Sequence, residues 1–119
     1  MIINGRERKF LRTTGATIEI AKMCPGDDLG KIEALFNDTS TAKIYENIMK
    51  MAVIFNKGYE GREAMMNGTT ADPLKEEELL TLTDEEFAEL QEEVLKAWAN
   101  EKATIQTKAK GKKKEEDSI

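Results

Sequence analysis

Carboxylates are the side chains in this sequence that could most readily do chemistry. Of the 23 acidic residues, ten fall between Asp72 and Glu93, where only Lys75 opposes them. Two carboxylates can act as general acid and base when their surroundings push their protonation apart. We expect the glutamates in 76–78 and 85–93 to lie on exposed helix faces, where every carboxylate meets the same solvent and their pKa values are not driven apart. Acid–base catalysis is therefore not predicted.

The other groups that usually carry catalysis or hold cofactors are missing. The chain has no histidine, which removes the usual general base and the commonest metal ligand. Its single cysteine, Cys24, has no basic partner that would make it a nucleophile, so we expect a small buried hydrophobe at a helix end. Asp27 and Asp28 lack the spacing of a calcium loop, and no glycine run forms a phosphate loop. The sequence predicts a protein that is not an enzyme and has no cofactor or metal site.

What remains is a binding or assembly module that acts through shape, apolar contact and charge. Six methionines permit an adaptable apolar surface of the kind that grips varied or extended clients. Core filling is the commoner role of methionine. Met65 and Met66 lie in a glycine-flanked segment and are the better candidates for exposure.

Net charge and composition restrict the compartment and the partners. A net charge of -5 argues against general nucleic-acid binding, because the protein as a whole repels polyanions. One cysteine cannot form an internal disulfide, which favours a reducing cytosol. No apolar run approaches the roughly 18 residues that a membrane span requires. We expect a soluble intracellular protein without membrane contact.

The N-terminal segment 1–11 is typical of a short β-hairpin. Asn4-Gly5 is a favoured two-residue turn, because both positions accept positive φ. The second arm is polar, so the hairpin should form an exposed edge, with Phe10 touching the core.

Apolar spacing predicts helices over the first half of the chain. A helix over 16–23 would place Ile18 inward, and Asp27 or Asp28 would cap a short helix over 29–36. The strongest pattern before the midpoint runs over 41–56.

The second half should hold further helices. Glycines at positions 58, 61 and 68 predict a short helix near 60–66 flanked by flexible loops. Asp72-Pro73 is typical of a helix start, since Asp caps well and Pro suits the first helical position. Thr83 and Glu86 have the spacing of a capping box, and the helix that follows should reach at least Asn100.

Two apolar lines share the helix over 41–56, which is either central to the core or offers one line to a partner. The first line and matching positions elsewhere predict the core, namely Ile18, Ile44, Ile48, Met51, Phe55, Phe87, Leu90, Val94 and Trp98. The second line and the methionine pair are the candidate client-binding residues, namely Tyr45, Met49, Val53, Met65 and Met66.

The end of the chain reverses the charge pattern. From Lys102 to Lys114 there are six lysines and no acid, and little remains to bury after Thr104. The sequence predicts a mainly α fold, α+β at most, with about five helices. It would comprise a single helical domain over 1–104, which includes the hairpin at 1–11, and a disordered lysine-rich tail over 105–119.

Two stretches of the sequence resemble a known family. Met1-Ile2-Ile3-Asn4-Gly5-Arg6 and Thr14-Gly15-Ala16-Thr17-Ile18-Glu19-Ile20-Ala21-Lys22 resemble the start of the small tail assembly chaperones of long-tailed bacteriophages and prophages of Gram-positive hosts. The likeness extends over roughly Met1 to Asn100 and includes the length, the acidic helical body and the lysine-rich end. That family has no catalytic motif.

The resemblance implies a chaperone that binds the long helical tape measure protein, keeps it soluble and helps the tail tube assemble around it. It implies action in the cytoplasm of the bacterial host and absence from the mature virion. Family members also commonly have a longer form made by a programmed -1 frameshift, which is thought to engage the tail tube protein. Lys112, Lys113 and Lys114 are the candidate slippage region, because consecutive lysines use A-rich codons. Self-association is compatible with the sequence, which specifies no symmetry.

Two alternatives stay open at this point. A small acidic adaptor or regulatory module could use the face from Phe87 to Trp98 as its docking surface. A nucleic-acid-binding accessory protein could use Lys108 to Lys114, although Glu115, Glu116 and Asp117 follow directly and no aromatic side chain is interleaved for stacking.

Overall fold

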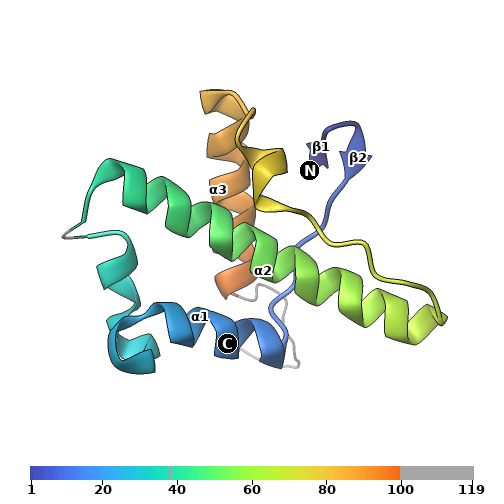
Figure 1. Cartoon of the computed structure of the whole chain (residues 1–119), viewed down its shortest axis with the longest axis horizontal. Coiled ribbons are helices and arrows are strands. Elements are labelled where there is room, and N and C mark those ends of the chain that lie inside the picture. The colour runs from blue at the N-terminus through green and yellow to red at the C-terminus, as the bar shows by residue number, and fades with distance from the viewer. Residues whose placement is uncertain (38, 100–119) are drawn as a thin grey trace, which may run out of the picture.

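A long central helix organises the fold (Figure 1). In the computed structural model, which describes residues 1–37 and 39–99, helix α2 spans Thr41–Asn67. Helix α1 (Thr14–Met23) runs beside it, and helix α3 (Asp84–Ala99) crosses behind it in the view of Figure 1. Three short 3-10 segments connect them, η1 (Pro25–Asp27), η2 (Leu29–Leu35) and η3 (Glu76–Leu79). The predicted mainly α fold is confirmed. None of the described helices is long and apolar enough to cross a membrane.

The N-terminal hairpin forms as predicted. Strands β1 (Ile2–Ile3) and β2 (Arg6–Glu7) pair antiparallel around the Asn4-Gly5 turn. Both turn residues have positive φ, 52° and 80°, which asparagine and glycine adopt at low cost. Ile3 is buried in the core, whereas Ile2 is exposed.

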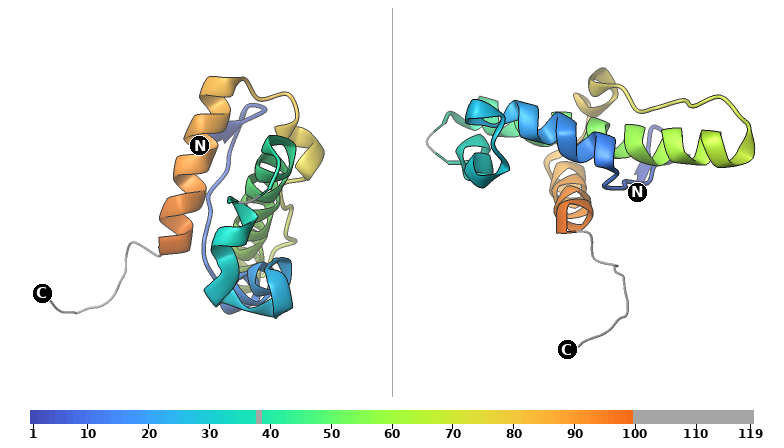
Figure 2. Two further views of the ribbon diagram at one scale, coloured as in Figure 1. Left: turned by 90° about the vertical axis from the view of Figure 1, so that its left-hand side faces the viewer. Right: turned by 90° about the horizontal axis from the view of Figure 1, so that it is seen from below.

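A strap formed by residues 8–13 links the hairpin to α1 and passes between α2 and α3 (Figure 2). The Leu11 N–H donates to the Phe55 carbonyl at 3.0 Å. The Asn56 side-chain amide donates to the Lys9 carbonyl at 2.9 Å. The strap is therefore fixed directly to the backbone and side chains of α2.

Helix α1 buries a face other than the predicted one. Thr13 caps it by accepting the Ala16 N–H at 3.1 Å. Ala16 and Ile20 are buried against α2, whereas Ile18 is 52% exposed, so its assignment to the core is wrong. Two residues of separation turn a helix by about 200°, and Ile18 therefore faces away when Ala16 and Ile20 face inward.

Cys24 is buried at the end of α1, as predicted. Its thiol donates to the Ile20 carbonyl at 3.4 Å. Burial raises the pKa of the thiol, and the nearby Asp28 carboxylate raises it further. The thiolate is disfavoured, which is the condition of a structural cysteine.

The next segment is short and capped as expected. Asp28 accepts the Gly30 N–H at 2.9 Å and begins η2, which is a 3-10 segment and not the predicted α-helix over 29–36. Ser40 then caps α2 by accepting the Lys43 N–H at 3.1 Å.

Helix α2 continues well beyond the predicted end at Asn56. We expected a loop around Gly58 before a separate short helix near 60–66, but Gly58 is helical, and one continuous helix ends at Gly68, whose φ is 67°. Tertiary packing explains the glycine at position 58. A Cβ on Gly58 would lie 2.9 Å from the Leu11 carbonyl oxygen, so only glycine allows the strap to cross here.

The connector after α2 also differs from the prediction. Asp72 does not cap a helix, because η3 begins only at Glu76, after the buried Leu74 and the extended Lys75. Asp72 instead forms an ion pair with Arg6. The Asp72 carbonyl accepts from Arg8, which is 4% exposed and faces Glu60 at 3.6 Å. The connector is thereby tied to the hairpin arm.

Helix α3 begins with the predicted capping box. The Thr83 N–H donates to Glu86 at 2.9 Å, and the Glu86 N–H donates to Thr83 at 3.2 Å. Leu90 and Val94 face the core, while most acids of this helix are exposed. The acidic stretch over α3 is thus chiefly a solvated face.

The core lies between α2 and the elements that surround it. Apart from Ile18, the predicted core residues either are buried or pack against the buried cluster, namely Ile44, Ile48, Met51, Phe55, Phe87, Leu90, Val94 and Trp98. Ile3, Leu74 and Leu79 join them from segments that lack helical periodicity. The predicted tail over 105–119, with Lys112, Lys113 and Lys114, lies outside the described residues.

Candidate functional site

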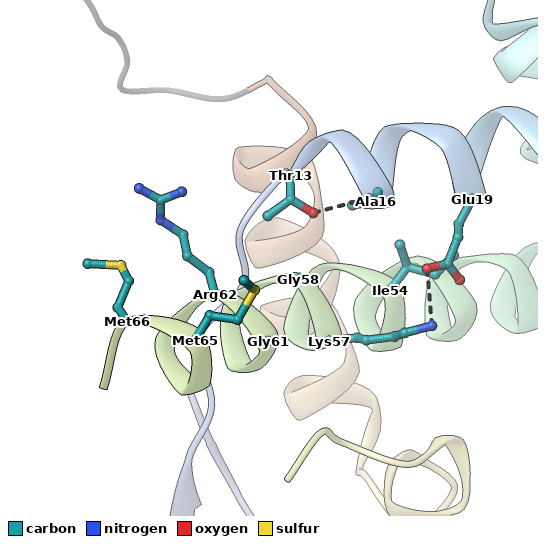
Figure 3. Close-up of a pocket in the computed structure, with 11 residues that line it drawn as sticks. Thr13, Ala16, Glu19, Ile54, Lys57, Gly58, Gly61, Arg62, Met65 and Met66 are labelled. Atoms are coloured by element: carbon teal, nitrogen blue, oxygen red, sulfur yellow. Dashed lines mark hydrogen bonds and ion pairs between the residues drawn. The ribbon is translucent and has the colours of Figure 1, made fainter. Parts of the chain in front are cut away.

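A hollow of about 460 Å³ lies between the start of α1 and the second half of α2 (Figure 3). Its floor is apolar, and charged side chains stand on its rim. It is lined by Thr13, Gly15, Ala16, Glu19, Ile54, Lys57, Gly58, Gly61, Arg62, Met65 and Met66. We call this hollow the methionine groove.

Two helical glycines shape the methionine groove. Each costs about 1 kcal/mol of helix stability relative to alanine. At Gly58 the strap occupies the space that a side chain would need, whereas nothing lies within 4 Å of a Cβ on Gly61. Packing against the strap explains why position 58 is a glycine. The missing side chain at Gly61 leaves space open in the groove.

Met65 and Met66 form the most exposed apolar pair of the described chain. Their exposed fractions are 87% and 67%. They stand near the end of α2 that projects beyond α1 and α3 (Figure 1), and Figure 3 shows them beside Arg62. The predicted exposure of this pair is confirmed, and its contact with a client stays a prediction. Unbranched thioether chains adapt to irregular apolar partners.

One ion pair crosses from α1 to α2 at the rim of the groove. Lys57 Nζ lies 3.2 Å from Glu19 Oε2, and the two side chains are 60% and 42% exposed (Figure 3). Exposed pairs of this kind contribute about 0 to 1 kcal/mol. A ligand could therefore displace this pair at little cost.

The structure divides the predicted line of Tyr45, Met49 and Val53. Tyr45 stacks on Phe87 of α3, with ring centroids 4.5 Å apart, and so contributes to packing between helices. Tyr45 is still 43% exposed, so its contact with a client stays a prediction. Met49 and Val53 are partly buried and line shallow hollows on the side of α2 that faces η3.

The structure also limits one alternative docking surface, the face from Phe87 to Trp98. Leu90 and Val94 are buried, and Phe87 and Trp98 pack against the core. Arg12 further covers the Trp98 ring, with its guanidinium carbon 3.9 Å from the ring centroid. The centre of the face from Phe87 to Trp98 is therefore occupied by the core, and only parts of Phe87 and Trp98 remain accessible.

Several lining residues could not be predicted as site residues. Ala16 and Ile54 read as ordinary helix positions, and only the fold brings them together. Gly58 and Gly61 did carry a signal, because two glycines three residues apart interrupt an apolar pattern that otherwise continues. Within residues 1–37 and 39–99, no group of three or more metal-ligating side chains is close enough to hold an ion.

Comparison with known proteins adds no relative. No protein-family model matches the chain, and neither curated proteins nor solved structures include a significant match.

Proposed function

We propose that this chain is a client-binding chaperone of the phage tail assembly class, which holds apolar helical segments of a tape measure protein. The observation that carries the proposal is the methionine groove, with two exposed methionines beside an open hollow on an uncovered helix end. The residues of the first 22 positions that resemble tail assembly chaperones supply the class.

The physical argument starts from the client. A very long helical protein with an apolar stripe aggregates when that stripe meets water or another copy. A chaperone must cover part of the stripe without demanding one fixed set of side chains. Methionines suit this task because they repack around different partners.

The charge of the chaperone supports the same role. A net charge of -5, with acids exposed along α3, makes coated complexes repel one another. The proposal includes action in the host cytoplasm and absence from the mature virion. It also includes a longer form for the tail tube protein, produced by slippage near Lys112, Lys113 and Lys114. A gene without a slippery heptamer and an overlapping -1 frame there would remove the longer form from the proposal.

The test is co-expression of the full chain with a fragment of the tape measure protein from the same genome. Wild-type chain should keep the fragment soluble and co-purify with it. The double variant Met65→Ser/Met66→Ser should weaken binding at least about tenfold, because burying a methionine contributes about 1.5 to 3 kcal/mol.

Leu95→Ser is the matched control. Leu95 is also exposed, at 54%, but it lies on α3 and does not line the methionine groove. This variant should bind as wild type does. Failure of the wild-type chain to bind the fragment, or equal binding by the double variant, would contradict the proposal.

A further inference from the structure

The methionine groove continues into two further hollows along α2. It shares Glu19 and Ile54 with a second hollow of about 570 Å³, which also contains Val53 and Met23. That hollow shares Lys50 with a third of about 610 Å³, which Met49 and Leu80 line. We call the three together the long groove.

The long groove has the dimensions of a helix-binding site. From Met49 to Met65, α2 advances about 24 Å, which is the length of a helix of about 16 residues. Apolar side chains stand at both ends, since Leu80 is 69% exposed and Met65 is 87% exposed. Val53 and Ile54 continue the apolar surface between them.

The lining comes almost entirely from helical elements. Helices α1 and α2 and the 3-10 segment η3 supply nearly all of it, and their backbone groups are engaged within their own turns. No described strand borders the groove, so an extended peptide would find no sheet edge to pair with. A helix satisfies its own backbone and needs only apolar contact.

Charge differs between the two ends of the long groove. At the methionine end, Glu19 and Lys57 neutralise each other, which leaves the guanidinium of Arg62 as the remaining charge of the lining. At the opposite end the lining contains Glu76 and Glu77. The charged rim is thus basic at the Met65 end and acidic at the Leu80 end.

The third hollow keeps its negative sign when the other charged residues of its own lining are counted. Lys50 offsets one of the two glutamates, and Glu46, also in the lining, pairs with Lys43 at 3.8 Å. In the lining of the third hollow one negative charge therefore remains, whereas Lys22 lines the second hollow, which also contains Glu76 and Glu77.

We propose that the long groove binds one amphipathic helix in a set direction, with its acidic end at Arg62 and its basic end at Glu76 and Glu77. This inference rests on the proposed function and specifies the class of client segment. Apolar contact supplies most of the affinity, because exposed charge pairs contribute only about 0.2 to 1 kcal/mol each. The charges of Arg62, Glu76 and Glu77 decide in which direction the bound helix lies.

The test uses the full chain and two synthetic helical peptides of about 18 residues with the same apolar stripe. One carries glutamates in its first half and lysines in its second, and the other has the reverse order. Each bears a photo-crosslinker at its N-terminus. The glutamate-first peptide should label the chain near Met65, and the lysine-first peptide should label it near Leu80. Labelling of the same end by both peptides, or labelling outside the groove, would overturn the inference.

A charge-reversed variant sharpens the test. Arg62→Glu/Glu76→Lys/Glu77→Lys should exchange the two labelling patterns while changing each affinity by less than about fivefold. Glu85→Lys adds the same net charge on α3, away from the groove, and should leave the patterns as they are. Unchanged labelling in the triple variant would reject the assignment of direction.

The two proposals fail differently. If the tape measure fragment binds but neither peptide does, the helix inference is wrong and the chaperone proposal stands. If both peptides bind in the expected directions but the fragment does not, the groove is assigned correctly and the proposed client is wrong.

Discussion

The side-chain oxygen of Asn56 accepts the backbone N–H of Leu74 at 2.7 Å in the interior of the protein. The same side chain donates to the Lys9 carbonyl, and Asn56 is 0% exposed. One amide on α2 therefore holds both the strap and the connector. Without this side chain, the Lys9 carbonyl and the Leu74 N–H would each lose a hydrogen-bond partner inside the protein.

Replacement of Asn56 by alanine should destabilise the fold by about 2 to 4 kcal/mol, because two polar backbone groups lose their partner. Chemical denaturation measures the change. Asn67→Ala is the control, since Asn67 is exposed near the end of α2 and makes only a 3.4 Å bond to Glu63. It should shift stability by about 0.5 kcal/mol at most. Equal effects of the two variants would contradict the proposed role of Asn56.

Gly58 and Gly61 should respond in opposite directions to alanine. Gly58→Ala places a Cβ 2.9 Å from the Leu11 carbonyl oxygen and the Thr13 hydroxyl, so we expect a loss of about 1 to 3 kcal/mol. Gly61→Ala meets nothing within 4 Å and should gain about 0.5 to 1 kcal/mol of helix stability. Thermal unfolding compares them. Stabilisation by both substitutions would show that the strap does not press on α2.

Ile18 and Ile20 form a second matched pair, on α1. Ile20 is 0% exposed, so Ile20→Ala should cost about 2 to 4 kcal/mol by leaving a cavity. Ile18 is 52% exposed, and Ile18→Ala should change stability by about 0.5 kcal/mol or less. Urea unfolding distinguishes them. A larger cost at Ile18 would place the opposite face of α1 in the core.

Asp72 should make stability depend on pH in the acid range. The hydrogen bond from Arg6, together with the charge of Arg6, holds the pKa of the Asp72 carboxyl below its ordinary value. Because the folded pKa is the lower one, the contribution is fully present above the unfolded pKa of about 3.9 and is lost as pH falls through the folded pKa. The stability gap between wild type and Asp72→Asn should therefore narrow below about pH 4.

Urea midpoints across a pH series measure that gap. Glu85→Gln is the control, because Glu85 is exposed on α3 and forms no ion pair among the described residues. The difference in stability between Glu85→Gln and wild type should change less with pH than the difference between Asp72→Asn and wild type. A constant gap for Asp72→Asn would show that the ion pair with Arg6 does not persist in solution.

Local signals in the sequence were sufficient for the elements that depend on neighbouring residues. The Asn4-Gly5 turn and the Thr83 capping box are each defined within a few positions, and both form as predicted. The extension of α2 past Gly58 was not predictable in this way. The need for glycine at position 58 arises from a strap that approaches from another part of the chain.

The same distinction applies to Asp72. Its position before a proline is typical of a helix cap, but Arg6, 66 residues away, takes its carboxylate. The Leu74 N–H, two residues after Asp72, donates to the Asn56 side-chain oxygen, and the backbone of Lys75 is extended. Tertiary partners thus override a local preference.

The candidate site could be predicted only in part. Exposure of Met65 and Met66 followed from the glycines around them. The groove beside them requires α1 to lie against α2, and periodicity does not specify which helices become neighbours. The stacking of Tyr45 on Phe87 could not be predicted for the same reason, because Phe87 comes from α3.

The contact between Arg12 and Trp98 joins residues 86 positions apart. During synthesis, the strap and α2 leave the ribosome before α3 does, so one side of the strap stays uncovered until α3 has emerged. Helices α1 and α2 can pair early, whereas closure of such a long loop comes late and slowly. The domain is therefore completed only when nearly all of its residues have been made, and a product that stops before Trp98 leaves the strap open to proteases.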